Sequence, residues 1–155
     1  MAVVLAALLD ERRVVLELQA RTGEAALREI VGTMADSPEL KDAEAFLQEV
    51  FAREEKHSTY LGHGVALPHA RTDLVTGVLL GIGRSRAGIP FGENGEPAHL
   101  IFLVGVPQRL LTDYLVCVGA VARLTSEEAT RAALMNAKTA PELVEILREG
   151  SLLLE

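Results

Sequence analysis

The densest group of reactive side chains lies between positions 53 and 71, a stretch that holds three of the four histidines. His57, His63 and His69 are spaced six residues apart, so a zinc site is the first possibility to consider. Zinc motifs usually combine ligand spacings of roughly two to four residues with thiolate or carboxylate partners. Neither this spacing of the histidines nor a local cysteine is present, so we expect no bound metal or other cofactor, and we expect His57 and His63 to be ordinary surface residues.

His69 differs from the other histidines because Pro68 fixes the backbone directly before it. A neutral imidazole is a competent nucleophile near neutral pH. A phosphorylated imidazole would carry roughly two negative charges, and Gly62 and Gly64 allow a tight turn that leaves backbone N–H groups free to bind them. The residues alone also permit a simpler interpretation, in which His69 is a turn residue hydrogen-bonded to the backbone. Further donors suited to a phosphoryl group are the side chains of Arg53, Ser58, Thr59 and Arg71.

Other nucleophiles are less well supported by the sequence. There is no Gly-x-Ser-x-Gly elbow of the kind that serine hydrolases use. Cys117 is the only cysteine and stands in an apolar run, so we expect it to be buried and inert. A lone cysteine cannot form an internal disulfide, which favours a reducing cytosol. We expect the acidic pair Glu54-Glu55 to lie on a solvated helix face.

The elements that must position these residues alternate between strands and helices. The β-branched run 14–18 predicts a first strand, and the apolar runs 77–84 and 99–106 predict strands covered on both faces. Glycine-rich turns are expected over 87–97. A short helical turn is predicted over 2–9, and helices are predicted from the cap Thr22 to 31 and from Pro38 to 55. Further helices are predicted over 111–124, from 126, and from a capping box formed by Thr139 and Glu142. The expected fold is α/β (α+β), a single domain over 1–155 with helices on both sides of a small sheet.

Composition excludes two classes of partner. The 155 residues contain 22 acidic and 15 basic side chains, for a net charge of −7, which argues against nucleic-acid binding. No apolar run approaches the roughly 20 residues of a membrane span, so we expect no membrane insertion and a cytoplasmic protein. The apolar opening lacks a basic region before it and runs into Asp10-Glu11-Arg12-Arg13, unlike an export signal. Leucines near both ends leave a homodimer possible.

The stretch as a whole resembles a known signature. Arg53-Glu54 is followed by Ser58-Thr59 and then by Gly62-x-Gly64. The whole run from Ser58 to Arg71 reads STYLGHGVALPHAR. This resembles the enzyme IIA domains of the fructose, mannitol and nitrogen-regulatory class (EIIA type 2) of the bacterial phosphoenolpyruvate-dependent phosphotransferase system. A looser resemblance continues over essentially the whole chain.

The resemblance implies a three-layer α/β/α fold around a mixed sheet, of the phosphotransferase/anion-transport-protein type. It implies that His69 accepts a phosphoryl group from the histidine phosphocarrier protein. The acceptor would be a sugar-transport IIB domain or a regulatory target. It also implies that Arg53 neutralises phosphate charge beside His69, and that Ser58, Thr59 and Gly64 help to form the phosphate pocket, with Arg71 as a further donor. Such a transfer needs positioning and charge neutralisation and no metal.

One departure from the family pattern affects the expected chemistry. Family members commonly carry a second histidine at the start of the helix after the long strand, and Tyr114 occupies that place here. A phenol can donate a hydrogen bond to phosphate but cannot become a cation. Two hypotheses therefore stand: a phosphocarrier acting through His69, or a regulatory or ligand-binding module with weakened phosphotransfer. A metal-dependent enzyme built on the histidine cluster is a third.

Overall fold

The computed structural model describes residues 5–154 and begins with two single-turn 3-10 helices, Leu5–Leu8 and Glu11–Arg13. Six strands form one sheet: β1 (Val14–Val15), β2 (Tyr60–Gly62), β3 (Val65–Ala66), β4 (His69–Arg71), β5 (Leu79–Pro90) and β6 (Pro97–Val106). The helices are α1 (Gly23–Gly32), α2 (Ala43–Lys56), α3 (Leu111–Thr125), α4 (Glu128–Asn136) and α5 (Ala140–Leu153).

The sheet is mixed and is organised around the long antiparallel hairpin of β5 and β6. Its strand order is β1-β5-β6-β3-β2, and β4 pairs with β6 beyond β3. Both β3 and β4 run parallel to β6, with Val65 opposite Leu100 and His69 opposite Val104. The strand that begins with His69 is therefore fixed in register against the centre of the sheet.

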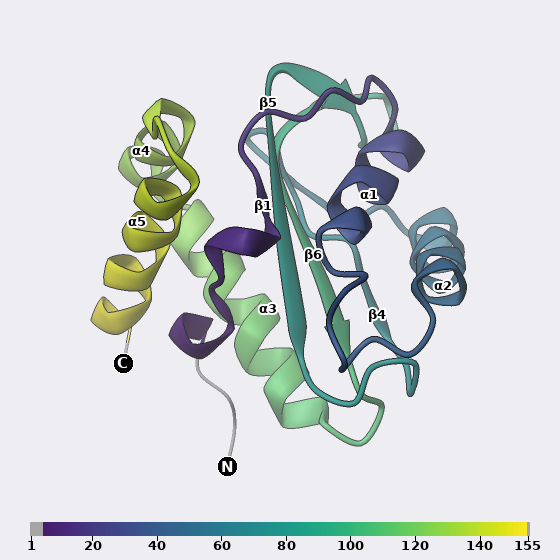
Figure 1. Ribbon diagram of the computed structural model, residues 1–155. Helices are drawn as coiled ribbons and strands as arrows, with labels where there is room; N and C mark the ends of the chain where they lie inside the picture. The colour runs from purple at the N-terminus through teal and green to yellow at the C-terminus, as the bar shows by residue number, and fades with distance from the viewer. Residues whose placement is uncertain (1–4, 155) are drawn as a thin grey trace.

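Helices cover both faces of the sheet, which gives the three layers expected from the sequence (Figure 1). Helices α1 and α2 pack on one face, and α3, α4 and α5 on the other. Successive side chains of a strand point to opposite faces. On β6, Phe102 faces the α3–α5 side whereas Ile101 and Leu103 face the α1–α2 side, so a nearly continuous apolar run serves two cores.

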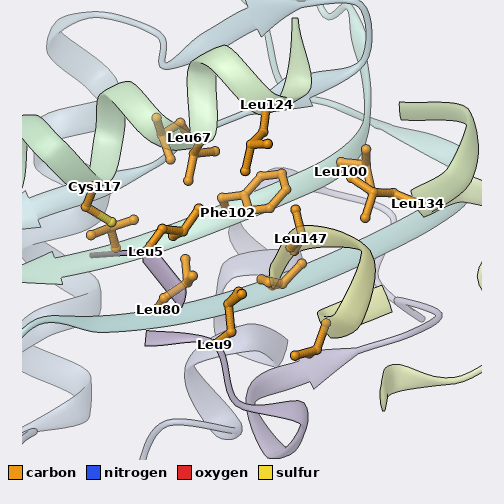
Figure 2. Close-up of a cluster of buried hydrophobic side chains, with 14 of the residues drawn as sticks. Leu5, Leu9, Leu67, Leu80, Leu100, Phe102, Cys117, Leu124, Leu134 and Leu147 are labelled. Atoms are coloured by element: carbon orange, nitrogen blue, oxygen red, sulfur yellow. The ribbon is translucent and has the colours of Figure 1, made fainter. Parts of the chain in front are cut away.

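The core beneath α3, α4 and α5 is centred on Phe102 (Figure 2). Leu5, from the first 3-10 helix, joins it beside Leu80 and Leu147, so the beginning of the described chain is sealed against the last helix. Cys117 lies in the same cluster with no exposed surface. Burial raises the pKa of its thiol to about 12, which confirms an inert packing residue.

The opposite core requires α1 to lie close to the sheet, and Gly81 on β5 makes this possible. A Cβ atom at Gly81 would lie 2.7 Å from Cγ2 of Ile30 and 2.9 Å from Sδ of Met34. Both of these side chains are fully buried on α1 and the turn after it. The glycine therefore sets the distance between helix and strand.

Several sequence predictions of helix and strand ends are confirmed. The hydroxyl of Thr22 accepts a hydrogen bond from the N–H of Ala25, and that of Thr139 accepts one from Glu142, so both residues cap helices as predicted. The carboxylate of Glu142 accepts from the N–H of Lys138, one residue before the cap. Of the turn expected over 2–9, residues 5–8 form a 3-10 helix, and residues 2–4 lie outside the described part of the chain.

Other predicted boundaries were wrong. The helix expected from Pro38 begins at Ala43, because Asp42 provides the cap, while Leu40 forms an isolated bridge with Val75. The first strand covers only 14–15 of the expected 14–18. Strand β5 continues to Pro90 through a stretch predicted as turns, since a register shift between Arg84 and Ile89 lets the hairpin pairing resume. No helix within residues 5–154 has the length and apolar character needed to cross a lipid bilayer.

Candidate functional site

His69 is the first residue of β4 and is 8% exposed. Its Nδ1 lies 2.8 Å from the carbonyl oxygen of Leu67, two residues earlier. A carbonyl oxygen can only accept, so Nδ1 carries the ring proton and donates it to Leu67. In the neutral ring the lone pair is then on Nε2, the nitrogen that faces Tyr114. His69 is thus hydrogen-bonded to the backbone, as the simpler sequence interpretation expected, and that same bond prepares Nε2 as a nucleophile.

Tyr114 lies in the first turn of α3 and contacts His69 across the end of the sheet. Its hydroxyl is 3.1 Å from Nε2 of His69, and the two rings are tilted by 51° with centroids 5.3 Å apart. The guanidinium of Arg71 lies over the ring of Tyr114, 5.8 Å from its centroid. It also donates a hydrogen bond to the carbonyl of Gln108 at 3.3 Å. Arg71 therefore lies beside the site as a cation that a ligand can approach.

An open pocket of about 390 Å³ begins at His69 and is lined by residues of the C-terminal half of α2, of β4 and of the start of α3. Arg53, in the last turn of α2, is oriented by a 2.9 Å hydrogen bond from its Nη1 to the carbonyl of His57. Three cationic side chains and one carboxylate share the pocket, so it favours an anion. The residues that line it are Glu49, Ala52, Arg53, Lys56, His69, Ala70, Arg71 and Tyr114.

Electrostatics keep the His69 ring neutral. Burial lowers its pKa below the ordinary value of 6.5, and the positive charge of Arg53 lowers it further. The hydrogen bond to the Leu67 carbonyl and the negative charge of Glu54 act in the opposite direction. With the pKa lowered, the unprotonated nucleophilic form predominates at neutral pH.

Three residues predicted to line a phosphate pocket lie outside this one. Thr59 is buried, and its hydroxyl donates to the carboxylate of Glu54 at 2.7 Å. The hydroxyl of Ser58 accepts from the N–H of Tyr60. Gly64 forms the turn between β2 and β3 with a φ of 80° and donates its N–H to the Tyr60 hydroxyl. The partners of all three are Glu54 and Tyr60, and none of the three lines the pocket beside His69.

Sequence reasoning missed two charged residues of the pocket wall. Glu49 and Lys56 are spaced four residues before and three residues after Arg53, so all three lie on one face of α2. That helical spacing was the available signal. The expectation that Glu54 is simply solvated was also wrong, because its two oxygens accept the N–H and the hydroxyl of Thr59, both at 2.7 Å.

The remaining histidines of the stretch do not join His69. His57 is exposed at the end of α2, and His63 is exposed in the β2–β3 turn with a φ of 54°. Across the described residues 5–154, no three side chains of the His, Cys, Asp or Glu type gather closely enough to hold a metal ion.

Comparison with protein families assigns this chain to a known family. Residues 7–150 match the family model described as phosphoenolpyruvate-dependent sugar phosphotransferase system, EIIA 2. The chain belongs to this family. The match covers His69, its pocket and every α-helix apart from the last turn of α5.

Two curated relatives support the assignment. The fructose-specific EIIA component of Haloferax volcanii is 30% identical over 135 residues, which are 86% of this chain and 88% of the relative. The fructose-specific EIIABC component of Bacillus subtilis is 27% identical over 143 residues, 92% of this chain. This chain spans only 22% of the length of the Bacillus relative.

Solved structures share the fold. The nitrogen regulatory protein IIA-Ntr of Neisseria meningitidis superimposes with a TM-score of 0.84 at 27% identity, covering 92% of this chain and 97% of that one. Enzyme IIA mannitol of Escherichia coli, solved in complex with phosphorylated enzyme IIB mannitol, has a TM-score of 0.79 at 20% identity. That match covers 91% of this chain and 97% of the other. The EIIA members similar to this chain thus include both sugar-specific and nitrogen-regulatory proteins.

Proposed function

We propose that this protein is a cytoplasmic phosphocarrier in which Nε2 of His69 accepts a phosphoryl group from the phosphohistidine of the histidine phosphocarrier protein. The observation that carries the proposal is the hydrogen bond from Nδ1 of His69 to the Leu67 carbonyl, because it leaves the lone pair on the nitrogen beside the cationic pocket. The lone pair of Nε2 forms the new N–P bond. The donor's N–P bond breaks, and its electron pair returns to the donor imidazole.

The pocket residues supply what this step requires. Phosphorylation adds roughly two negative charges beside Nε2. Arg53, Lys56 and Arg71 offset that charge, while Glu49 opposes it. The proton stays on Nδ1, hydrogen-bonded to the Leu67 carbonyl, so the ring needs no proton transfer to react. The hydroxyl of Tyr114 gives up its hydrogen bond to Nε2 and becomes a donor to a phosphoryl oxygen.

For the acceptor, we propose a IIB domain or a regulatory target protein. The complex of the Escherichia coli IIA and phosphorylated IIB mannitol enzymes supports the first, and the likeness to the Neisseria nitrogen regulatory protein supports the second. Either acceptor would receive the phosphoryl group that His69 has taken from the donor.

A second candidate is a binding or regulatory module with weakened phosphotransfer. The observation that favours it is again the Tyr114 hydroxyl, which occupies Nε2 in the unphosphorylated protein. A ring nitrogen held in this hydrogen bond must lose it before it can attack phosphorus.

The two candidates are separated by intact mass after incubation with phosphoenolpyruvate, enzyme I and the phosphocarrier protein. We expect an acid-labile gain of about 80 Da, one phosphoryl group, that is absent from His69→Ala. The same mass gain in His69→Ala would show that the phosphoryl acceptor is another residue. No gain in folded wild-type protein with active donors would favour the binding module.

A further inference from the structure

Two neighbouring residues at the end of α2 act on opposite sides of the site. Arg53 lines the pocket, whereas Glu54 binds the loop that follows the helix. We propose that Glu54 is a positioning residue, which holds the Leu67 carbonyl against Nδ1 of His69 through a chain of hydrogen bonds passing through Thr59. This inference rests on the proposed function of His69 as the phosphoryl acceptor.

The first link is the contact between Glu54 and Thr59. The two carboxylate oxygens accept the backbone N–H and the hydroxyl of Thr59, each at 2.7 Å. Thr59 is 6% exposed and Glu54 is half-buried, so this pair of charge-assisted bonds is partly shielded from water. Because both the backbone N–H and the side chain of Thr59 are hydrogen-bonded to Glu54, the orientation of Thr59 relative to α2 is fixed.

The second link carries that orientation to His69. The carbonyl of Thr59 accepts the N–H of Leu67 at 3.1 Å, and the carbonyl of Leu67 accepts Nδ1–H of His69 at 2.8 Å. On the far side, the Pro68 carbonyl accepts the N–H of Val104 at 3.0 Å. Leu67 is therefore held between the Thr59 loop and the central strand β6, and the ring of Pro68 fixes the φ angle of the residue that directly follows Leu67.

The position of the Leu67 carbonyl decides which nitrogen of His69 can react. If the carbonyl turns away, Nδ1 loses its acceptor and the ring is free to place its proton on Nε2, which removes the nucleophilic lone pair. A shift of even about 1 Å at a reacting group can cost roughly a hundredfold in rate. Glu54 thus acts on the reaction without touching the phosphoryl group.

Three variants separate hydrogen bonding from charge. Glu54→Met removes both acceptors and keeps a side chain of similar length. In Glu54→Gln the amide oxygen still accepts the Thr59 N–H, and the amide nitrogen can donate to its hydroxyl, so the contact survives without the charge. Glu55→Met is the matched control, because Glu55 is the exposed neighbour on the same helix.

The first readout is the tautomer of His69, from ¹⁵N chemical shifts of its ring in a Tyr114→Phe background, where only the Leu67 carbonyl selects the tautomer. We expect a single Nδ1–H form in the background, with Glu54→Gln and with Glu55→Met. With Glu54→Met we expect a mixture. A single unchanged tautomer with Glu54→Met would overturn the proposal.

The second readout is the initial rate of phosphorylation with Tyr114 present. We expect a fall of roughly tenfold or more in Glu54→Met and rates within about twofold of wild type in Glu54→Gln and Glu55→Met. An equal loss in Glu54→Gln would mean that charge matters and would overturn the positioning role. Should Glu54→Met fail to fold, Thr59→Val removes only the hydroxyl bond and is expected to shift the tautomer in the same direction. Absence of any wild-type phosphorylation would refute the proposed function alone, because the tautomer measurement does not depend on it.

Discussion

The hydroxyl of Tyr114 donates a hydrogen bond to Nε2 of His69 across 3.1 Å. Tyr114, which the resemblance places where a second histidine is common, therefore contacts the proposed phosphoryl acceptor directly. Because the opposite nitrogen donates to Leu67, the ring of His69 is held at both ends. This arrangement favours a neutral, uniquely oriented ring, and it also places a competing hydrogen bond on the reactive nitrogen.

Replacing Tyr114 with histidine is expected to increase the rate of phosphoryl transfer several-fold. An imidazole at this position can become a cation and face the incoming phosphoryl charge, which a phenol cannot do. Rapid-quench measurement of phosphohistidine formation checks the prediction. Tyr114→Phe is the control, since it frees Nε2 without supplying a donor. If histidine and phenylalanine have the same effect, release of Nε2 is the whole explanation.

Arg53→Lys is expected to slow phosphorylation roughly tenfold and to leave the free energy of unfolding almost unchanged. The guanidinium can hold the His57 carbonyl through Nη1 and still present its other N–H groups to the phosphoryl oxygens. An ammonium group is a point charge without this fork. The same rate assay, with Lys56→Arg as a control that keeps the pocket's charge, tests this. Equal rates in wild type and Arg53→Lys would show that Arg53 serves only to hold the loop.

Phosphorylation is expected to persist at lower pH than the ordinary pKa of histidine would allow. Burial lowers the pKa of His69 below 6.5, so the neutral nucleophile survives as the pH falls through that value. The rate should decline only when the pH reaches the lowered pKa. An NMR titration of the His69 ring beside the pH–rate profile checks the coincidence. A rate that halves near pH 6.5 would contradict the lowered pKa.

The same shift makes stability depend on pH. A histidine with a lowered pKa in the folded state binds protons more readily when unfolded, so acid favours unfolding. The stabilisation is fully present above pH 6.5 and is lost as the pH falls from there through the folded-state pKa. Urea unfolding at about pH 7.5 and about pH 5.5 measures the loss. His69→Gln should lose less stability between these two conditions than wild type, and an equal loss would assign the effect to other groups.

The sequence predicts the parts of this molecule that depend on local pattern. The caps Thr22 and Thr139 act on their own helices, and the apolar runs of β5 and β6 signal strands buried on both faces. His69 stands out because Pro68 and Arg71 are close to it in the chain. Each of these signals lies within a few residues of the feature that it predicts.

The parts that could not be predicted depend on contacts between distant segments. Leu40 pairs with Val75 instead of continuing a helix, and this bridge is invisible to helical periodicity. Thr59 has a hydroxyl of the kind that binds phosphate, but in the structure this hydroxyl donates to Glu54, because the loop folds back on α2. Tertiary contacts thus decide between uses that the residue type leaves equally open.

Arg84 illustrates the same limit and gives a final prediction about stability. It is 2% exposed on β5, and its guanidinium donates to carbonyls of Leu16, Leu134 and Ala137 at 3.0, 2.9 and 2.6 Å. Within residues 5–154 no carboxylate forms an ion pair with it. The cation instead ties the end of α4 to the start of the sheet, by satisfying backbone groups that would otherwise be buried without partners.

Arg84→Met is therefore expected to lower the free energy of unfolding by about 3 kcal/mol, because several buried carbonyls lose their donor at once. Arg86→Met, two residues along the same strand, removes only an exposed contact with Glu17 and should change stability by no more than about 0.5 kcal/mol. Urea denaturation of both variants measures the difference. Phosphorylation of His69 should proceed in folded Arg84→Met, since Arg84 pairs with Leu100 and His69 pairs further along β6 with Val104. Equal stability of the two variants would mean that water replaces the guanidinium at the α4 terminus.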